Sequence, residues 1–197
     1  MTVQPVVALH DALTLGILAG GRASRLAGRD KAWLERQGTP LVLALSAQLA
    51  PDVEATLVSA NRNLERYLSH GLRVIQDRVV DIGPLGGIEA LVAACRTPWL
   101  LTVPVDVVNV DDSLVRTLCA AAGTVGAWAE GDDGPQPLIA LWRSDALRTA
   151  CADAIASGRY AIHALQTQMG MTKVRFDGIR FGNLNTPDDL VAAGIEF

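Results

Sequence analysis

The sequence has little of what marks three common classes of protein. It has no dense basic run: 17 lysines and arginines are outnumbered by 21 acidic residues, for a formal net charge of -4. Such a balance argues against general nucleic-acid binding. Its three cysteines, Cys95, Cys119 and Cys151, are widely separated. They lack the close pairing of zinc sites and redox dithiols, so we expect buried thiols in a reducing compartment.

The first residues of the sequence predict neither a targeting segment nor a membrane segment. The stretch MTVQPVVALHDALTLGILAGG has no basic beginning, and His10 and Asp11 interrupt its apolar residues. Neither a signal peptide nor a membrane span fits this pattern. We therefore expect a short tail over residues 1–12 and one cytoplasmic domain over residues 13–197, long enough to bury its own core.

Lysine is scarce as well, and one of the two lysines ends a glycine-rich loop. Lys173 lies far along the chain, whereas Lys31 closes LAGGRASRLAGRDKAWL, residues 18–34. A strand that ends at Gly20 and Gly21 lets backbone N–H groups approach a phosphate, because no side chain stands in the way. Positive charge would surround that concavity, from Arg22, Arg25, Arg29 and Lys31.

Two familiar phosphate loops do not match this spacing. The dinucleotide fingerprint requires G-x-G-x-x-G and the Walker loop requires G-x-x-x-x-G-K-[ST]. Here Lys31 is followed by Ala32, and the glycines fall at positions 16, 20, 21 and 28. The alternative to a phosphate-binding loop is an ordinary strand-to-helix turn whose arginines are solvated.

Short apolar runs alternate with amphipathic segments along the rest of the chain. Predicted strands cover residues 13–19, 53–61, 72–77, 99–106, 124–130, 137–143 and 172–176. Predicted helices cover 41–50 (after Thr39 as cap and Pro40 in the first turn), 63–70, 88–96, 111–122, 144–157 (capped by Ser144), 160–170 and 187–194 (opened by Thr186). This alternation predicts an α/β fold with three layers and a doubly wound, mostly parallel sheet, made mixed by a hairpin after Gly123. Ligands of such folds bind beyond the carboxyl ends of the strands, where Gly20, Asp77 and Asp106 fall.

The glycine-rich loop resembles a known signature. LAGGRASRLAGRDKA is similar to the L-x-G-G-x-S-x-R-M-G-x-D-K motif of nucleotidyltransferases. Further motifs follow in the order of the molybdenum cofactor guanylyltransferase (MobA-type) family: VSANR, GLRVIQD, GPLGG, VPVD, PLIALW and NLNTPDDL. The resemblance implies a Rossmann-like nucleotidyltransferase fold and transfer of GMP from GTP to molybdenum-bearing molybdopterin, with release of pyrophosphate.

The resemblance also implies roles for individual residues. Leu18, Ala19, Gly20 and Gly21 would form the loop that binds the base and the phosphates, and Lys31 would contact the triphosphate. Asn61 and Asp77 would belong to the nucleotide pocket, and Gly83 and Gly87 would line its guanine side. Asp106 would hold Mg²⁺. Lys31, Arg25 and Asp106 are the expected catalytic residues. A single carboxylate suits magnesium, since that ion keeps waters and takes phosphate oxygens. Asp106 could instead cap the following segment, and Asp77 could close a turn.

The acceptor side of the site is predicted less directly. Arg159 falls where the family supplies basic residues to the pterin, and Asn183 and Asn185 match its N-x-N-T-P motif. The chain departs from the family pattern at Ala27, where a glycine is usual, and at Ser59, where some members carry asparagine.

Two other functions remain open at this point. One is a related nucleotidyltransferase that uses CTP or another phosphorylated acceptor. The other is a non-catalytic GTP-binding or cofactor-binding protein. The resemblance further suggests transient contact with cofactor-insertion proteins or apo-molybdoenzymes, and it implies neither nucleic acid nor membrane as a partner.

Overall fold

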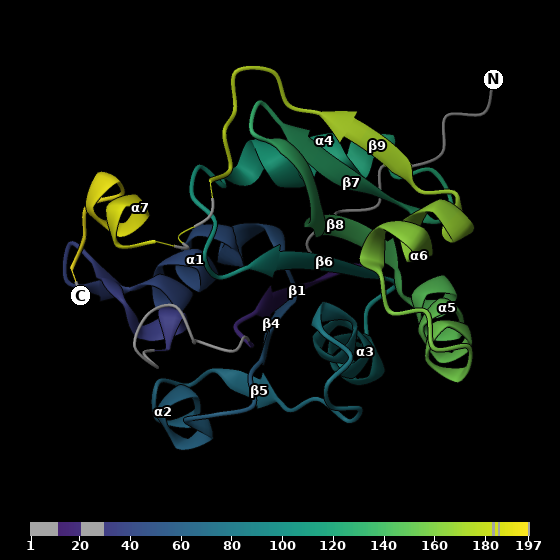
Figure 1. Cartoon of the computed structure of the whole chain (residues 1–197), viewed down its shortest axis with the longest axis horizontal. Coiled ribbons are helices and arrows are strands. Elements are labelled where there is room, and N and C mark those ends of the chain that lie inside the picture. The colour runs from purple at the N-terminus through teal and green to yellow at the C-terminus, as the bar shows by residue number, and fades with distance from the viewer. Residues whose placement is uncertain (1–11, 21–29, 183, 185, 197) are drawn as a thin grey trace.

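The fold is built on one twisted sheet. The computed structural model describes residues 12–20, 30–182, 184 and 186–196 (Figure 1). The sheet has seven strands in the order β5 (Arg73–Ile75), β4 (Ala55–Ser59), β1 (Leu13–Leu18), β6 (Trp99–Pro104), β8 (Gly134–Arg143), β7 (Gly126–Gly131) and β9 (Thr172–Arg175). Neighbours from β5 to β6 are parallel, β8 is antiparallel to β6 and β7, and β9 is parallel to β7. The predicted mixed, mostly parallel sheet is confirmed.

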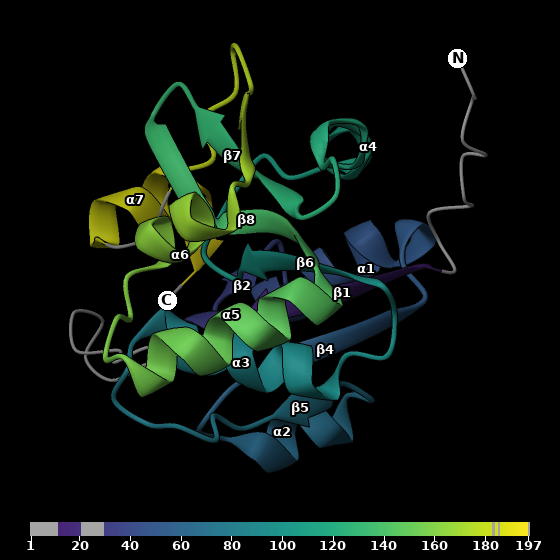
Figure 2. The same cartoon turned by 90° about the vertical axis from the view of Figure 1, so that its right-hand side faces the viewer.

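Helices cover both faces of this sheet (Figure 2). One face packs against α1 (Leu41–Leu49), α2 (Leu64–Ser69) and α4 (Asp112–Ala121), and the other against α3 (Pro84–Ala94), α5 (Ser144–Ala156) and α6 (Ile162–Met169). The result is the expected three-layer α/β architecture. Of the helices in the described ranges, none is long and apolar enough to cross a bilayer.

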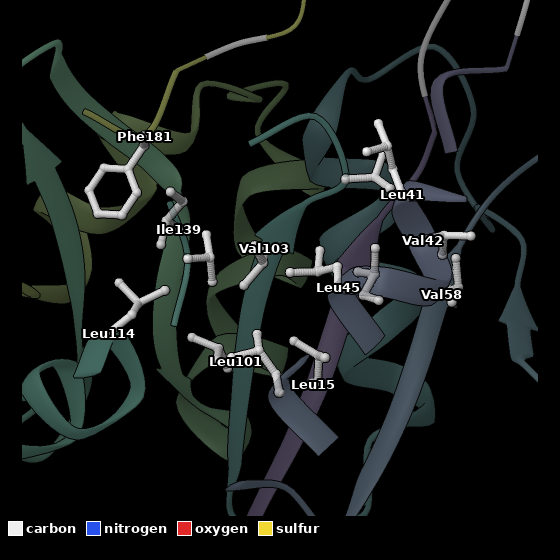
Figure 3. Close-up of a cluster of buried hydrophobic side chains, with 14 of the residues drawn as sticks. Leu15, Leu41, Val42, Leu45, Val58, Leu101, Val103, Leu114, Ile139 and Phe181 are labelled. Carbon is white, nitrogen blue, oxygen red and sulfur yellow. The ribbon is translucent and has the colours of Figure 1, made fainter. Parts of the chain in front are cut away.

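Alternating strand residues divide the core between the two faces. On the α1 side, Leu15, Leu101 and Ile139 meet Leu45 of α1 and Leu114 of α4 (Figure 3). Because side chains alternate along a strand, the intervening positions face α3 and α5. All these side chains are almost fully excluded from solvent, and their burial is the main source of stability for such a fold.

Gly16 in the centre of β1 shows why the strand contains a glycine. A Cβ atom built there would lie 2.9 Å from Leu91 Cδ1 and 3.1 Å from Leu100 Cδ1. The missing side chain therefore lets α3 pack closely over β1, the strand that leads into the glycine-rich loop.

Three details of the helix starts differ from the prediction. Thr39–Pro40 form a short strand, β3, so α1 begins at Leu41 without a side-chain cap. Arg143 occupies the cap position of α5, and Ser144 is the first helical residue. Helix α3 begins at Pro84 instead of residue 88, because a proline is well tolerated in the first turn.

A small second sheet was not predicted. It joins β10 (Ile195–Glu196), β2 (Glu35–Arg36) and β3 in antiparallel pairs. Two 3-10 turns, η2 (Lys31–Trp33) and η3 (Ala50–Asp52), complete the N-terminal half. The last helix, α7 (Pro187–Ala192), begins as predicted at Thr186, whose hydroxyl forms a capping box with Asp189.

Candidate functional site

The carboxyl ends of β1, β4 and β6 lie side by side and carry several of the predicted residues. Leu18 at the end of β1 pairs with Ser59 of β4 and Pro104 of β6. Beyond the strands, the Ala19 N–H donates to the Ser59 carbonyl (2.9 Å), and the Val105 N–H donates to the Leu18 carbonyl (3.1 Å). Ala19 and Gly20 therefore leave the sheet between Asn61 on one side and Asp106 on the other.

Asp77 and Asn61 form one polar cluster at this edge. The Asp77 N–H donates to Asn61 Oδ1 (2.9 Å), and the hydroxyl of buried Ser59 donates to Asp77 Oδ1 (3.2 Å). A Cβ atom at Gly20 would lie 3.9 Å from Asn61 Nδ2. The structure thus brings three predicted residues together, and the departure at Ser59 places a hydroxyl against the Asp77 carboxylate.

The first turn of α3 packs directly onto this cluster. Gly83 precedes the helix with φ +65, which favours glycine. A Cβ at Gly86 would lie 3.0 Å from Asp77 Oδ2, and one at Gly87 would lie 2.6 Å from Ser59 Oγ. The glycines of the GPLGG motif therefore allow a helix N-terminus to approach the Asp77 carboxylate, which the helix dipole favours.

Lys31 and Asp106 form an ion pair near the ends of β1 and β6. Lys31 Nζ donates to Asp106 Oδ2 at 2.8 Å, and their side chains are 23% and 21% exposed. Both side chains are therefore mostly buried but still reach solvent. The Asp106 carboxylate is thus directed toward Lys31 and reaches solvent, and it is not enclosed in the core.

Asp30 and Tyr67 lie next to the turn that carries Lys31, and no role was predicted for them. The Tyr67 hydroxyl donates to Asp30 Oδ2 at 3.3 Å, and Asn63 Nδ2 donates to the same oxygen at 3.1 Å. Burial, followed by the charge of Asp30 and their hydrogen bond, raises the pKa of Tyr67 far above its usual range. The sequence signal was the position of Asp30 immediately before Lys31, but no local pattern connects Asp30 with residue 67.

A C-terminal segment closes the other side of the Asp106 loop. The Leu184 N–H donates to the Asp106 carbonyl (3.1 Å), and the Val108 N–H donates to the Phe181 carbonyl (2.7 Å). Asp133, in the β7–β8 turn, accepts hydrogen bonds from the N–H groups of Phe181 (3.2 Å) and Gly182 (2.7 Å). The turn between β7 and β8 therefore holds the segment that packs against Asp106.

Arg159 lies in the turn between α5 and α6. Its Nε donates to Ser157 Oγ at 2.9 Å, and its side chain is exposed. It lines a cavity of about 360 Å³ together with Ala154 and residues of α6. Its contact with the pterin stays a prediction.

Several predicted residues lie outside the described ranges. They are Gly21 and Arg25 of the glycine-rich loop, with its neighbours Arg22, Ala27 and Arg29, and Asn183 and Asn185 of the C-terminal motif.

Sequence comparison identifies the family. Residues 15–170 match the MobA-like NTP transferase domain. The chain belongs to the family of MobA-like NTP transferases. This MobA-like transferase is 37% identical to a molybdenum cofactor guanylyltransferase from Pseudomonas paraeruginosa, over 87% of this chain and 89% of that protein. It is 36% identical to another protein of that name from Cupriavidus taiwanensis, over 93% of this chain and 96% of that protein.

Solved structures share the fold of this MobA-like transferase. The molybdopterin-guanine dinucleotide biosynthesis protein A from Archaeoglobus fulgidus superimposes with a TM-score of 0.72 at 22% identity, covering 92% of this chain and 96% of that one. The 2-C-methyl-D-erythritol 4-phosphate cytidylyltransferase from Thermus thermophilus superimposes with a TM-score of 0.70 at 21% identity, covering 92% and 96%. At these identities the likeness shows the fold.

The described residues offer few ligands for a metal ion. Among the residues that the structure describes, no group of three or more histidine, cysteine, aspartate or glutamate side chains could hold a metal. A single partly exposed carboxylate, Asp106, agrees with magnesium bound largely by water and substrate phosphates.

Proposed function

We propose that this MobA-like transferase transfers GMP from GTP to molybdenum-loaded molybdopterin and releases pyrophosphate. The observation that carries the proposal is the Lys31–Asp106 pair at 2.8 Å, which lies beside the strand ends that hold Ala19, Gly20 and the Asp77 cluster. The 37% identity to a molybdenum cofactor guanylyltransferase supports the choice of substrates.

The proposed reaction is a direct displacement. An oxygen of the terminal phosphate of molybdopterin attacks the α-phosphorus of GTP, the new phosphorus–oxygen bond forms, and the bond to the β-phosphate breaks. Pyrophosphate leaves with the electron pair. Positioning and charge neutralisation carry most of the catalysis in such reactions, so no protein nucleophile is needed.

Each part of the site has a task in this scheme. Lys31, together with Arg25, neutralises charge that develops toward the pyrophosphate. Gly20 and Gly21 offer backbone N–H groups to the phosphates, while Asn61 and Asp77 bind the nucleoside. Gly83 and Gly87 line the guanine side. Asn183, Asn185 and Arg159 contact the acceptor.

Magnesium is the cofactor of the proposal, with Asp106 as its protein ligand. When bound, it supplies charge neutralisation at the phosphate oxygens. Asp106 would hold that ion, and the Lys31 ammonium, which contacts Asp106 in this structure, would then serve the phosphates of the nucleotide. We further propose that the reaction takes place in the cytoplasm, with transient contact to cofactor-insertion proteins or apo-molybdoenzymes.

The decisive experiment supplies the purified protein with molybdenum-loaded molybdopterin, magnesium and each of the four nucleoside triphosphates. We expect that, of the four nucleotides, only GTP gives pyrophosphate release and a guanine dinucleotide product, which mass spectrometry detects. Preference for CTP would instead show a cytidylyltransferase. Binding of GTP without pyrophosphate release would show a non-catalytic protein.

The chain offers a matched control for the role of the lysine. Lys31→Ala and Lys173→Ala remove the same charge, but Lys173 lies on β9, where it pairs with Glu130 at 2.9 Å. We expect only Lys31→Ala to lower turnover, by roughly a hundredfold, the size typical of a lost electrostatic contact in a transition state.

A further inference from the structure

The position of the Lys31 ammonium depends on more than the lysine side chain. A lysine side chain is flexible, so the place of its ammonium depends on how firmly the backbone beneath it is held. Lys31 is the first residue of the three-residue turn η2. On its C-terminal side the turn is anchored by Ala32, which is fully buried, and by Trp33, which is 7% exposed.

On its N-terminal side the turn is held by the Asp30 carboxylate. Asp30 Oδ1 accepts from the Ala32 N–H at 3.1 Å. Asp30 Oδ2 accepts from Asn63 Nδ2 at 3.1 Å and from the Tyr67 hydroxyl at 3.3 Å. One carboxylate therefore joins the turn that carries Lys31 to helix α2.

Helix α2 also holds the other end of the turn. Tyr67 is fully buried, and its ring centroid lies 4.9 Å from that of Trp33. The Arg66 guanidinium lies over the same indole, 4.2 Å from the ring centre. Since burial and the Asp30 charge raise the pKa of the Tyr67 hydroxyl, that group remains a donor to Asp30 across the neutral range.

We infer that Asp30, held by Tyr67 and Asn63, is a positioning residue that sets where the Lys31 ammonium lies. Neither Asp30 nor Tyr67 needs to touch the substrate for this role. Their effect reaches the phosphates through Lys31, so its consequence for catalysis depends on the proposed function. The placement of the Lys31 ammonium does not depend on the proposed function.

The first test uses no nucleotide. The protein is exposed to trace acetic anhydride, and acetylation of Lys31 is compared with that of Lys173 by peptide mass spectrometry. Lys173 serves as an internal reference because it is the second lysine of the chain and lies on β9. We expect Tyr67→Phe and Asp30→Asn to raise the ratio of Lys31 to Lys173 acetylation about threefold or more. The reason is that losing one hydrogen bond of Asp30 loosens the turn that carries Lys31.

Ser69→Ala is the matched control for this test. Ser69 also lies on α2, but its hydroxyl donates to the Arg66 carbonyl of the same helix. We expect its labelling ratio to equal that of the unaltered protein. An unchanged ratio in both Tyr67→Phe and Asp30→Asn would overturn the inference.

The second test measures GMP transfer. We expect Tyr67→Phe to lower kcat several-fold, and to have no further effect when Lys31 is already alanine, because the hydroxyl acts through that lysine. Additive losses, with a lower Tm and an unchanged labelling ratio, would show a merely structural role. If the protein does not transfer GMP at all, the proposed function fails while the labelling test still decides the inference.

Discussion

Under the proposed function, the shape of the Lys31 side chain matters as well as its charge. Arginine at position 31 would keep the charge, but its planar guanidinium is larger and less adaptable than an ammonium. We expect Lys31→Arg to fold normally and to lose roughly tenfold or more in kcat, measured by pyrophosphate release. Full turnover in this variant would contradict the role given to the lysine.

Gly87 is the second informative position at this scale. An added Cβ would come within 2.6 Å of Ser59 Oγ and 3.1 Å of Leu18 Cδ2. We expect Gly87→Ala to lower the free energy of unfolding by about 1–3 kcal/mol, as overpacking usually does. Urea denaturation measures this change.

Removal of the Ser59 hydroxyl provides the control for Gly87. The double variant Ser59→Ala/Gly87→Ala relieves the shortest contact, so its loss of stability should be smaller than the sum of the two single losses. Simple additivity would mean that the helix and the strand do not meet as closely as described.

At the scale of the elements, the β7–β8 turn fixes the C-terminal segment beside the Asp106 loop. Asp133 in this turn accepts from two backbone N–H groups of the segment that packs against the Asp106 loop. We expect Asp133→Ala to cost about 1–3 kcal/mol of stability, because two partly buried N–H donors lose their acceptor. Chemical denaturation and kcat should both report the change.

The neighbouring Asp132 is the control for that turn. Its carboxylate pairs with Arg175 at the surface, 2.6 Å away. Exposed ion pairs contribute little, so Asp132→Ala should change stability by less than about 1 kcal/mol. Equal losses in the two variants would remove the special role of Asp133.

Elements of the main sheet could be predicted because their signals are local. The apolar runs before Gly20, Asp77 and Asp106 mark strands whose parallel order brings their ends together, and the structure confirms this. The small sheet could not be found in this way. Its strands are only two residues long, and β10 comes from the opposite end of the chain from β2.

Long-range contacts explain what was missed within the site. Asp30 and Tyr67 are 37 residues apart, and Lys31 and Asp106 are 75 residues apart. Residue spacing carries no information about such pairs, since they depend on how two faces of a folded core meet. The resemblance to a family supplied Lys31 and Asp106 as individual residues, but not the ion pair between them.

At the scale of the whole molecule, burial affects how stability depends on pH. Burial raises the pKa of Cys151 from 9.0 to about 12 and that of Cys119 from 9.0 to about 11. The unfolded chain then loses these protons at lower pH than the folded one. Their contribution to stability is therefore complete below pH 9 and is lost as the pH rises toward the folded values.

The prediction is a fall in the free energy of unfolding between pH 9 and about 11. Urea denaturation at several pH values measures it. Tyr67 adds to the fall above pH 10, its ordinary value, because its pKa is raised too. Cys151→Ala should make the decline shallower than in the unaltered protein, and an equal slope would show that this thiol plays no part.

The ion pair between Lys31 and Asp106 has a consequence for which ligands can bind there. Within this pair the two opposite charges cancel. Under the proposed function, a free divalent cation must displace the Lys31 ammonium from Asp106, and a free phosphate must displace the Asp106 carboxylate from Lys31. In either case the Lys31–Asp106 contact is broken for the single contact that forms. A nucleotide that arrives with its metal replaces both contacts at once. We therefore expect free divalent cations and free phosphate to bind this pair more weakly than a metal–nucleotide complex does.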